Sequence, residues 1–354
     1  MKKSFVFICL IVTLSLLLSC SGSKAIDEVN IMERQEIFND SILTIEDYFP
    51  IKENTIKEYE GIGNEFAAKS TFVEFIAEGK VQIKEVNPGT SFVKVIEYKN
   101  GELKEIYAEG EFYHIENMLN ANTNKNNILL KEPIEVGNSW SNEDGTIKEI
   151  VSLNEIIETP LGFYEALLVT TKFPTGESLN EYYVKDYGLV ASIYRYGDIE
   201  VKTLLKEVDN KALELEIQSF YPTTDKIGTG LVEQKISFET NADIRELLEK
   251  ILKNPPSKKL IPAISNDVKI NEIQLNRESW ILEVDFSKEL RNDLNVGSAH
   301  ETEMLKSIVN TLGKFYDVDK VFISIEGIPY ESGHFGISEG EYFIVDTSNI
   351  IEIE

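Results

Sequence analysis

The chain has 354 residues and a formal net charge of −26 at pH 7, with 61 acidic residues against 35 basic ones. A surface this acidic repels nucleic-acid phosphates and anionic lipid head groups, which disfavours nucleic-acid binding and membrane attachment through a basic patch. Apolar residues make up 42% and aromatic residues 10%, a composition typical of packed globular domains that excludes wholesale disorder.

The first residues have the order of a secretory signal. Lys2 and Lys3 precede an uncharged apolar run, and the string Leu17-Leu18-Ser19-Cys20 places a small residue directly before a cysteine. A positive start, an apolar core and a small residue at the cleavage site are typical of signal peptides. The string resembles the lipobox of bacterial lipoproteins, in which the cysteine thiol receives a diacylglycerol and the chain is cut just before it. The resemblance implies a signal peptide at residues 1–19 and lipidation at Cys20.

Such an anchor predicts a protein on the extracytoplasmic face of the cell membrane, because two acyl chains are enough for stable attachment. The alternative is an uncleaved membrane anchor, since residues 4–23 are uncharged and a spanning helix needs about 20 residues. Thr13, Ser15 and the polar residues 19–23 dilute that segment, which favours the lipoprotein. Cys9 lies in the part that would be removed, so the mature chain would keep a single, lipidated cysteine. That excludes a disulfide, a thiolate nucleophile and a cysteine metal cluster within it.

The middle of the chain predicts a β-rich domain. Residues 20–45 are polar and charged without a regular pattern, and we interpret them as a tether. In residues 46–209, alternating apolar and polar positions predict strands, and Asn100-Gly101 is a strong hairpin-turn signal. The expected strands are residues 81–86, 91–98, 103–107, 166–172, 180–185 and 189–196. Strands at this spacing indicate an antiparallel sheet, curved into a half-barrel.

Residues 211–354 predict a second domain in which strands alternate with two amphipathic helices. We expect Thr240 to be the N-cap of the first helix, with Asp243 completing a capping box, and Ser298 with Glu301 to do the same for the second. The helices carry apolar stripes within residues 244–252 and 305–315. Strands are expected at residues 213–217, 232–238, 268–275, 280–286 and 321–325, with Trp280 on the apolar face of its strand. Both helices on one face of a small mixed sheet would bury their stripes, so the predicted fold class is α+β.

A series of motifs in this second domain resembles a known family. The string Leu282-Glu283-Val284-Asp285-Phe286-Ser287-Lys288-Glu289 is similar to a V-x-V-D-F-S-K-E signature. The helix Ile244-Arg245-Glu246-Leu247-Leu248 precedes it, and Gly297-Ser298 and then Asp319-Lys320-Val321 follow in order. On these motifs, residues 213–335 resemble GerMN, a domain of sporulation and spore germination. The resemblance implies a small, non-catalytic α/β module that mediates assembly at the envelope of endospore-forming bacteria.

The candidate reactive residues each have a simpler interpretation. His114 is expected in a half-buried strand, His300 in the first turn of a helix, and His334 in a glycine-flanked turn. Asp285 lacks a partner acid for catalysis, and an acidic residue on the outward face of a strand needs no catalytic explanation. Asp317 and Asp319 lack the ligand pattern of a dedicated calcium loop. We therefore predict no catalytic residue, no metal site and no cofactor.

The leading hypothesis is a non-enzymatic, lipid-anchored envelope protein that takes part in assembly during sporulation or germination. Its expected partners are the membrane, through Cys20, and envelope or sporulation proteins or a second copy of itself, but no nucleic acid. The alternative is a carrier for an apolar ligand such as a lipid, bound by the β-rich domain, with Phe112, Tyr113, Phe163 and Tyr164 as its aromatic set. An envelope hydrolase ranks third.

Overall fold

The structure, a computed structural model, describes residues 43–353, which lie in one compact unit. The predicted signal peptide, Cys20 and the tether up to residue 42 lie outside the described residues. Across residues 43–353, no helix combines the length and apolar character needed to cross a membrane.

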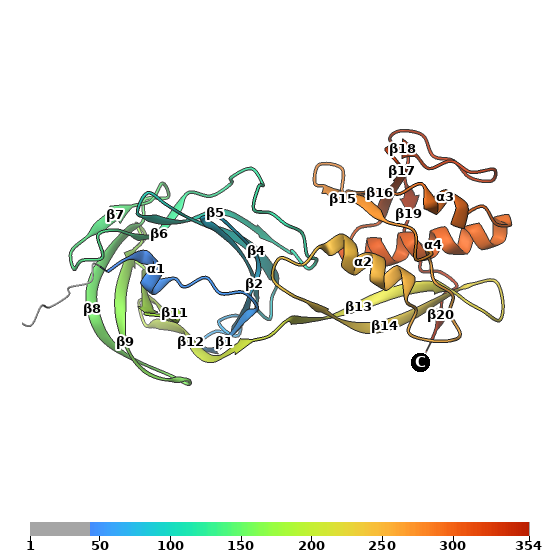
Figure 1. Cartoon of the computed structure of the whole chain (residues 1–354). Coiled ribbons are helices and arrows are strands. Elements are labelled where there is room, and N and C mark those ends of the chain that lie inside the picture. Colours follow the sequence, from blue (N-terminus) through green and yellow to red (C-terminus); the bar gives the residue numbers. More distant parts are fainter. Residues whose placement is uncertain (1–42, 354) are drawn as a thin grey trace, which may run out of the picture. The chain divides into compact units, whose positions relative to one another are not determined.

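The first half of the described chain is one twelve-stranded antiparallel sheet that curves round the short helix α1 (Figure 1). The strand order is β6-β5-β4-β3-β2-β1-β12-β11-β10-β9-β8-β7, so two six-stranded meanders meet where β1 pairs with β12. The elements are α1 (Ile45–Tyr48), β1 (Thr55–Ile62), β2 (Lys69–Ala77), β3 (Lys80–Val86), β4 (Ser91–Lys99), β5 (Glu102–Gly110), β6 (Asn127–Lys131), β7 (Ser139–Ser141), β8 (Ile147–Thr159), β9 (Gly162–Lys172), β10 (Ser178–Val184), β11 (Gly188–Tyr196) and β12 (Ile199–Asn210). The predicted curved antiparallel sheet is confirmed.

The predicted strands correspond to β3, β4, β5, β9, β10 and β11. Asn100 and Gly101 link β4 to β5 with φ of 54° and 72°, the left-handed pair that a two-residue hairpin turn requires. The sequence pattern did not predict β1, β2, β6, β7, β8 or β12. In β1, β2 and β8, several positions that line the interior carry lysine or threonine instead of apolar residues. In β8, register shifts between Ile150 and Glu155 also interrupt the two-residue period.

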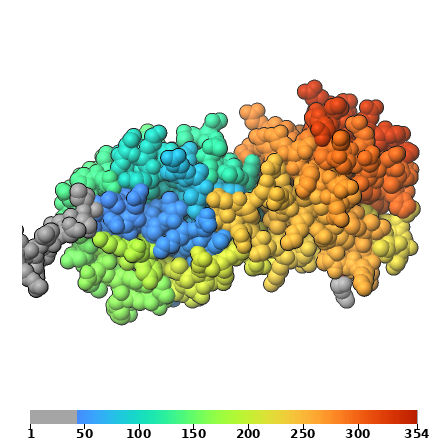
Figure 2. Space-filling view, in the orientation of Figure 1, coloured from blue at the N-terminus to red at the C-terminus, as the bar shows by residue number. Residues whose placement is uncertain are grey.

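Helix α1 fills one part of the space inside the sheet. The carboxylate of Asp47 accepts hydrogen bonds from the backbone N–H of Thr44 at 2.9 Å and from its hydroxyl at 3.1 Å, which fixes the first turn. Ile45 and Tyr48 are buried in a core shared with strands from both meanders. Figure 2 shows the first part of the described chain, in blue, next to the cyan and green parts of the sheet.

The second half of the described chain has two helices packed between two small sheets (Figure 1). One sheet has the order β13-β14-β20; the other has the order β15-β16-β17-β18, with β19 also paired to β17. The elements are β13 (Leu213–Pro222), β14 (Thr229–Phe238), α2 (Ile244–Lys253), β15 (Ile270–Asn276), β16 (Ile281–Phe286), α3 (Glu289–Asp293), α4 (Ser298–Tyr316), β17 (Lys320–Ile325), β18 (Ile328–Pro329), β19 (Phe343–Ile344) and β20 (Ile351–Glu352). Pairing is antiparallel between β15 and β16 but parallel between β16 and β17, so the predicted mixed sheet and the α+β class are confirmed. The helices, expected on one face of a single sheet, also bury their stripes against β13 and β14.

Three local predictions are wrong. Asp243, not Thr240, caps α2, by accepting a hydrogen bond from the backbone of Arg245 at 2.9 Å. The hydroxyl of Thr240 is already committed, since it accepts from the backbone of Asn54 at 2.7 Å and donates to the carbonyl of Val73 at 2.6 Å.

At α4 the N-cap is Gly297, and Ser298 is the first helical residue, so the second capping box does not form. Its expected partner Glu301 is fully buried and accepts a hydrogen bond from the hydroxyl of Tyr330 at 2.6 Å. Trp280 precedes β16 with a φ of 52° and is 54% exposed, so it does not share the buried face of that strand.

Candidate functional site

The curved sheet encloses a cavity of about 780 Å³. Strands from both meanders line it, together with residues just after α1 and the turn between β10 and β11. The cavity is bounded by two groups of charged side chains and by an apolar group.

The first charged group lies on β2, β3 and β4. Glu85 accepts a hydrogen bond from Lys69 at 2.8 Å and from Lys94 at 3.0 Å, and its side chain is 14% exposed. Burial by itself would raise the pKa of Glu85, but the two ammonium groups outweigh it and lower that pKa to about 2. This carboxylate is therefore ionised at any physiological pH and shared between two cations.

The second charged group lies on β8, β9 and β10. Lys148 and Glu181 form an ion pair at 2.7 Å, with side chains only 5% and 11% exposed. Thr171 stands directly opposite Lys148 in the β8–β9 ladder and is 3% exposed. Its hydroxyl has no hydrogen-bond partner within residues 43–353. Buried hydroxyls are usually paired, so this one marks an unsatisfied position on the cavity wall.

Several further ionisable groups on the wall, among them Lys57 and Glu105, lack a salt-bridge partner within the described residues. Lys57 donates a hydrogen bond to the carbonyl of Tyr187, and burial and then the charge of Lys52 lower its pKa to about 8. Glu105 on β5 is half-buried, and burial raises its pKa above the usual value.

Part of the remaining wall is apolar. Its strand residues include Val73, Val81, Ile83, Ile96, Leu129 and Leu189. The cavity thus combines charged groups with hydrocarbon surface, a lining suited to a ligand that has both characters.

The aromatic residues expected to form a ligand site do not line this cavity. Phe112 is buried in a different cluster, whereas Tyr113 and Phe163 are 54% and 72% exposed. Tyr164 packs against Tyr187 at a ring distance of 5.4 Å without lining the cavity itself. The expected aromatic set is therefore wrong. Lysines and glutamates at inward strand positions were the only sequence signal of the site, and an isolated charge in a strand usually indicates an exposed face.

The predicted strand at His114 is also wrong, because the residue lies in the loop between β5 and β6. It is 4% exposed, with its ring 4.2 Å from that of Phe112 and 4.9 Å from that of Tyr316. Its Nε2 lies 3.2 Å from Glu116, which Arg277 contacts at 2.9 Å. The histidine is thus part of a packed cluster between the loop and the second half of the chain. His300 and His334 are exposed.

Asp285, in the signature-like string, is held by three hydrogen bonds. Its carboxylate accepts from the hydroxyl of Ser324 at 2.6 Å, the backbone of Gly327 at 2.7 Å and the amide of Asn271 at 2.8 Å. Burial opposes ionisation, but these donors lower the pKa of Asp285 below its usual value. The residue links β15, β16 and the turn after β17.

The other acidic candidates have structural positions. Asp317 is the C-cap of α4, with a φ of 55°, and the carbonyl of Asp319 accepts from Val345. Residues 43–353 hold no group of three histidine, cysteine or acidic side chains arranged for a metal ion.

Comparison with known proteins identifies the second half of the chain. Residues 218–331 match the family model Germane, described as sporulation and spore germination. The chain therefore carries a Germane domain, the GerMN domain that its motifs resemble. The match spans about a third of the chain, and no curated protein matches the sequence.

Two solved structures are each similar to part of this chain, at low sequence identity. A protein with a YmcC-like fold from Bacteroides fragilis has 13% identity and a TM-score of 0.31, and the match covers 46% of this chain and 98% of that one. The first GerMN domain of the sporulation protein GerM from Bacillus subtilis has 18% identity and a TM-score of 0.29, with 37% and 97% covered.

Proposed function

We propose that this protein is a non-enzymatic, lipid-anchored envelope protein whose Germane domain makes protein contacts during sporulation or germination. The observation that carries the proposal is the family match at residues 218–331. The Leu17-Leu18-Ser19-Cys20 string supports the anchor. The hydrogen bonds of Asp285 support a structural use of the signature-like string, since all of them join elements of the domain to one another.

The Germane domain presents a surface suited to protein contacts. Strand β15 has only β16 as a ladder neighbour among the described strands. On its other edge, Glu249 accepts from the backbone of Ile270 and Arg245 donates to the carbonyl of Asn271. The part of this edge nearer Trp280 is therefore the part left open for pairing. Trp280, in the turn that joins these two strands, is 54% exposed. Tryptophan is enriched among the residues that dominate binding energy at protein interfaces. We expect the contact surface to include this turn and the β15 edge.

The anchor is tested by fractionating cells that express the protein or its Cys20→Ser variant. The native protein is expected in the membrane fraction and the variant in the medium. A variant that stays in the membrane fraction would contradict lipid anchoring and favour an uncleaved membrane anchor.

The sporulation role is tested by following a fluorescent fusion through a sporulation time course in the native host. Enrichment at the septum or around the forespore supports the proposal. Uniform membrane labelling that does not change on starvation contradicts it.

The contact surface is tested by crosslinking in sporulating cells, comparing the native protein with Trp280→Ala. The variant should lose its crosslinked partners while remaining folded. Tyr196→Ala is a matched control, because Tyr196 is similarly exposed, at 50%, but lies on β11 of the twelve-stranded sheet. Equal crosslinking of the native protein and both variants would place the contact surface elsewhere. Sedimentation at increasing concentration then shows whether the partner is a second copy of the chain.

A further inference from the structure

The cavity inside the curved sheet has no part in the proposed function, so a ligand bound there is a separate property of the protein. Its volume, about 780 Å³, falls within the range of roughly 300–1,000 Å³ found for small-molecule pockets. The cavity lies entirely within the twelve-stranded sheet and its connections, so its ligand can be tested independently of the Germane domain.

The wall formed by β1 to β4 carries an excess of positive charge. Among the described residues, Lys57, Lys69 and Lys94 line it with a single acid, Glu85, so three cations and one anion leave two positive charges. In the sheet register Lys57 stands opposite Thr71, and Thr71 opposite Glu85, which places these three side chains in a row on one face. The excess is confined to this wall, since the rest of the lining adds two lysines and five acids: Lys52, Lys148, Glu105, Asp144, Glu181, Asp186 and Asp209.

Lys57 lacks a counter-ion of its own in the described part of the chain. Its ammonium donates to the carbonyl of Tyr187, and the charge of another cation, Lys52, adds to burial in lowering its pKa. A half-buried ammonium without an acidic partner loses hydration that a neutral carbonyl replaces only in part. An anionic group bound beside it would offset that loss.

The opposite wall carries a second feature that a bound ligand would explain. The hydroxyl of Thr171 is buried on the cavity wall without a partner in residues 43–353, beside the Lys148–Glu181 ion pair. A hydroxyl in such a position is normally satisfied by protein, water or ligand. Apolar residues of the lining, such as Ile83 on β3 and Leu129 on β6, offer surface to a hydrocarbon chain.

We propose that this cavity binds an amphiphile with an anionic head group, which lies against Lys57, Lys69 and Lys94 while its hydrocarbon chain covers the apolar wall. The head group is a carboxylate or a phosphate, since both accept charge-assisted hydrogen bonds from lysine. Free anions lack the chain, and neutral lipids lack the charge.

The first experiment separates head group from chain. Palmitate, hexadecanol and butyrate are titrated into the secreted chain carrying Cys20→Ser, so that no anchor lipid competes, and binding is followed by calorimetry and native mass spectrometry. We expect saturable binding of one palmitate, at least about tenfold weaker binding of hexadecanol, and no binding of butyrate at the same concentration. Equal binding of palmitate and hexadecanol, or of palmitate and butyrate, would overturn the proposal. Inorganic phosphate and a phosphatidic acid of short chain length then distinguish a free anion from a lipid phosphate.

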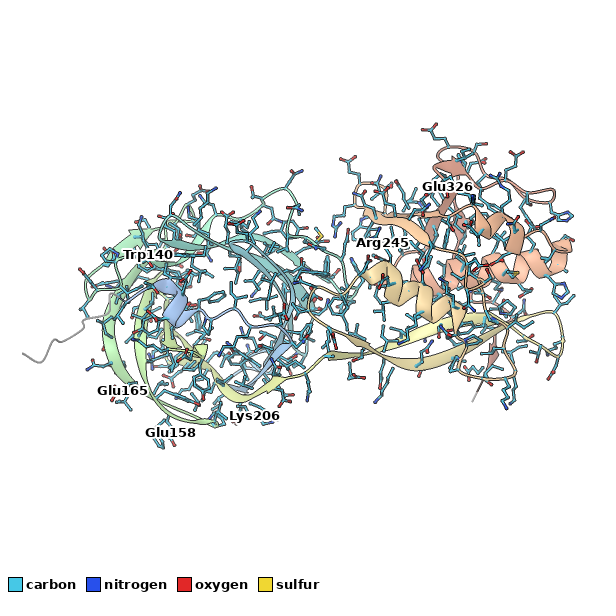
Figure 3. All side chains as sticks on the ribbon, viewed as in Figure 1. Trp140, Glu158, Glu165, Lys206, Arg245 and Glu326 are labelled. Atoms are coloured by element: carbon cyan, nitrogen blue, oxygen red, sulfur yellow. The ribbon has the colours of Figure 1, made fainter. Side chains whose placement is uncertain are left out.

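The second experiment locates the site. Lys57→Gln removes a cation without leaving an acid unpaired, and it should weaken palmitate binding about tenfold while leaving hexadecanol binding unchanged. Lys206→Gln is the matched control, because Lys206 is on β12 but is exposed and does not line the cavity (Figure 3). Leu129→Trp fills the apolar part and should abolish the binding of both ligands. If that variant fails to fold, the two lysine variants decide the question. Palmitate binding that is the same in Lys57→Gln and Lys206→Gln would overturn the assignment.

Discussion

The indole nitrogen of Trp140 donates a hydrogen bond to the backbone carbonyl of Ile128 at 3.1 Å, which joins β7 to β6. These are the two edge strands of the twelve-stranded sheet, and no ladder pairs them within residues 43–353. Asn142, just after β7, strengthens the link by accepting from the backbone of Ile128 at 2.9 Å. Side chains thus close the sheet at the point where the backbone pairing stops, which satisfies polar groups that an edge would otherwise leave open.

Trp140→Phe tests this closure. Phenylalanine keeps most of the buried ring but removes the indole donor and leaves the Ile128 carbonyl unpaired, so we expect a loss of about 1–2 kcal/mol in the free energy of unfolding. Urea denaturation measures it. Trp280→Phe is the control: this tryptophan is 54% exposed, against 6% for Trp140, and its variant should stay within about 0.5 kcal/mol of the native protein. Equal stability of the two variants would show that the indole bond does not hold the edges together.

Asp285→Asn tests the structural use of the signature-like string. The amide keeps the shape of the side chain and an oxygen that can accept from Ser324 and Gly327, but it removes the charge and the oxygen that accepts from Asn271. We expect the free energy of unfolding to fall by roughly 1.5–3 kcal/mol, the range for hydrogen bonds to charged groups. Glu283→Gln, on the exposed face of the same strand, should have little effect. A stable Asp285→Asn variant would reopen the question of another role for this residue.

Stability should fall in mild acid, partly through Glu85. Its pKa is about 2 in the folded protein but about 4.3 in an unfolded chain, so the unfolded state binds the extra proton between these values. The stabilisation is therefore complete above about pH 5 and is lost progressively as pH falls toward 2, by on the order of 1.4 kcal/mol per unit of pKa difference. Urea denaturation at pH 5, 4 and 3 should show a steeper decline for the native protein than for Glu85→Gln. Parallel declines would exclude Glu85 as a source of the pH dependence.

The effects on stability of substituting Arg277 and its acidic partners, Glu116 and Glu109, should be strongly coupled. The guanidinium lies 2.9 Å from Glu116 and 3.0 Å from Glu109, and its side chain is 29% exposed. Replacing it by methionine leaves two partly buried acids without a cation, which is expected to cost about 3 kcal/mol or more. A double-mutant cycle of Arg277→Met with Glu116→Gln should give a coupling energy of about 1–3 kcal/mol. Additive effects would mean that the two side chains do not interact in solution.

Local patterns were informative wherever one face of an element is apolar. The strands β3, β4 and β11 and the helices α2 and α4 followed from periodicity, because burial against a core demands apolar residues at regular spacing. The residues that cap the helices could not be predicted from periodicity. The sequence predicts Thr240 as an N-cap, but its hydroxyl accepts a hydrogen bond from Asn54, which lies far away in the sequence. Capping rules consider only neighbouring residues, so they could not predict that a distant donor takes this hydroxyl.

The sequence by itself determined the Germane domain and predicted the curved antiparallel sheet, because both depend on short-range patterns of residues. The predicted leader and Cys20 depend on such a pattern too. Only the tertiary structure decided where the cavity lies and what lines it. Lys57, Glu85, Lys148 and Glu181 come together because β1 pairs with β12 and the sheet curves back on itself. Each of these charges, taken alone, resembles an exposed strand residue. Their common inward direction is a property of the curvature, which long-range strand pairing sets.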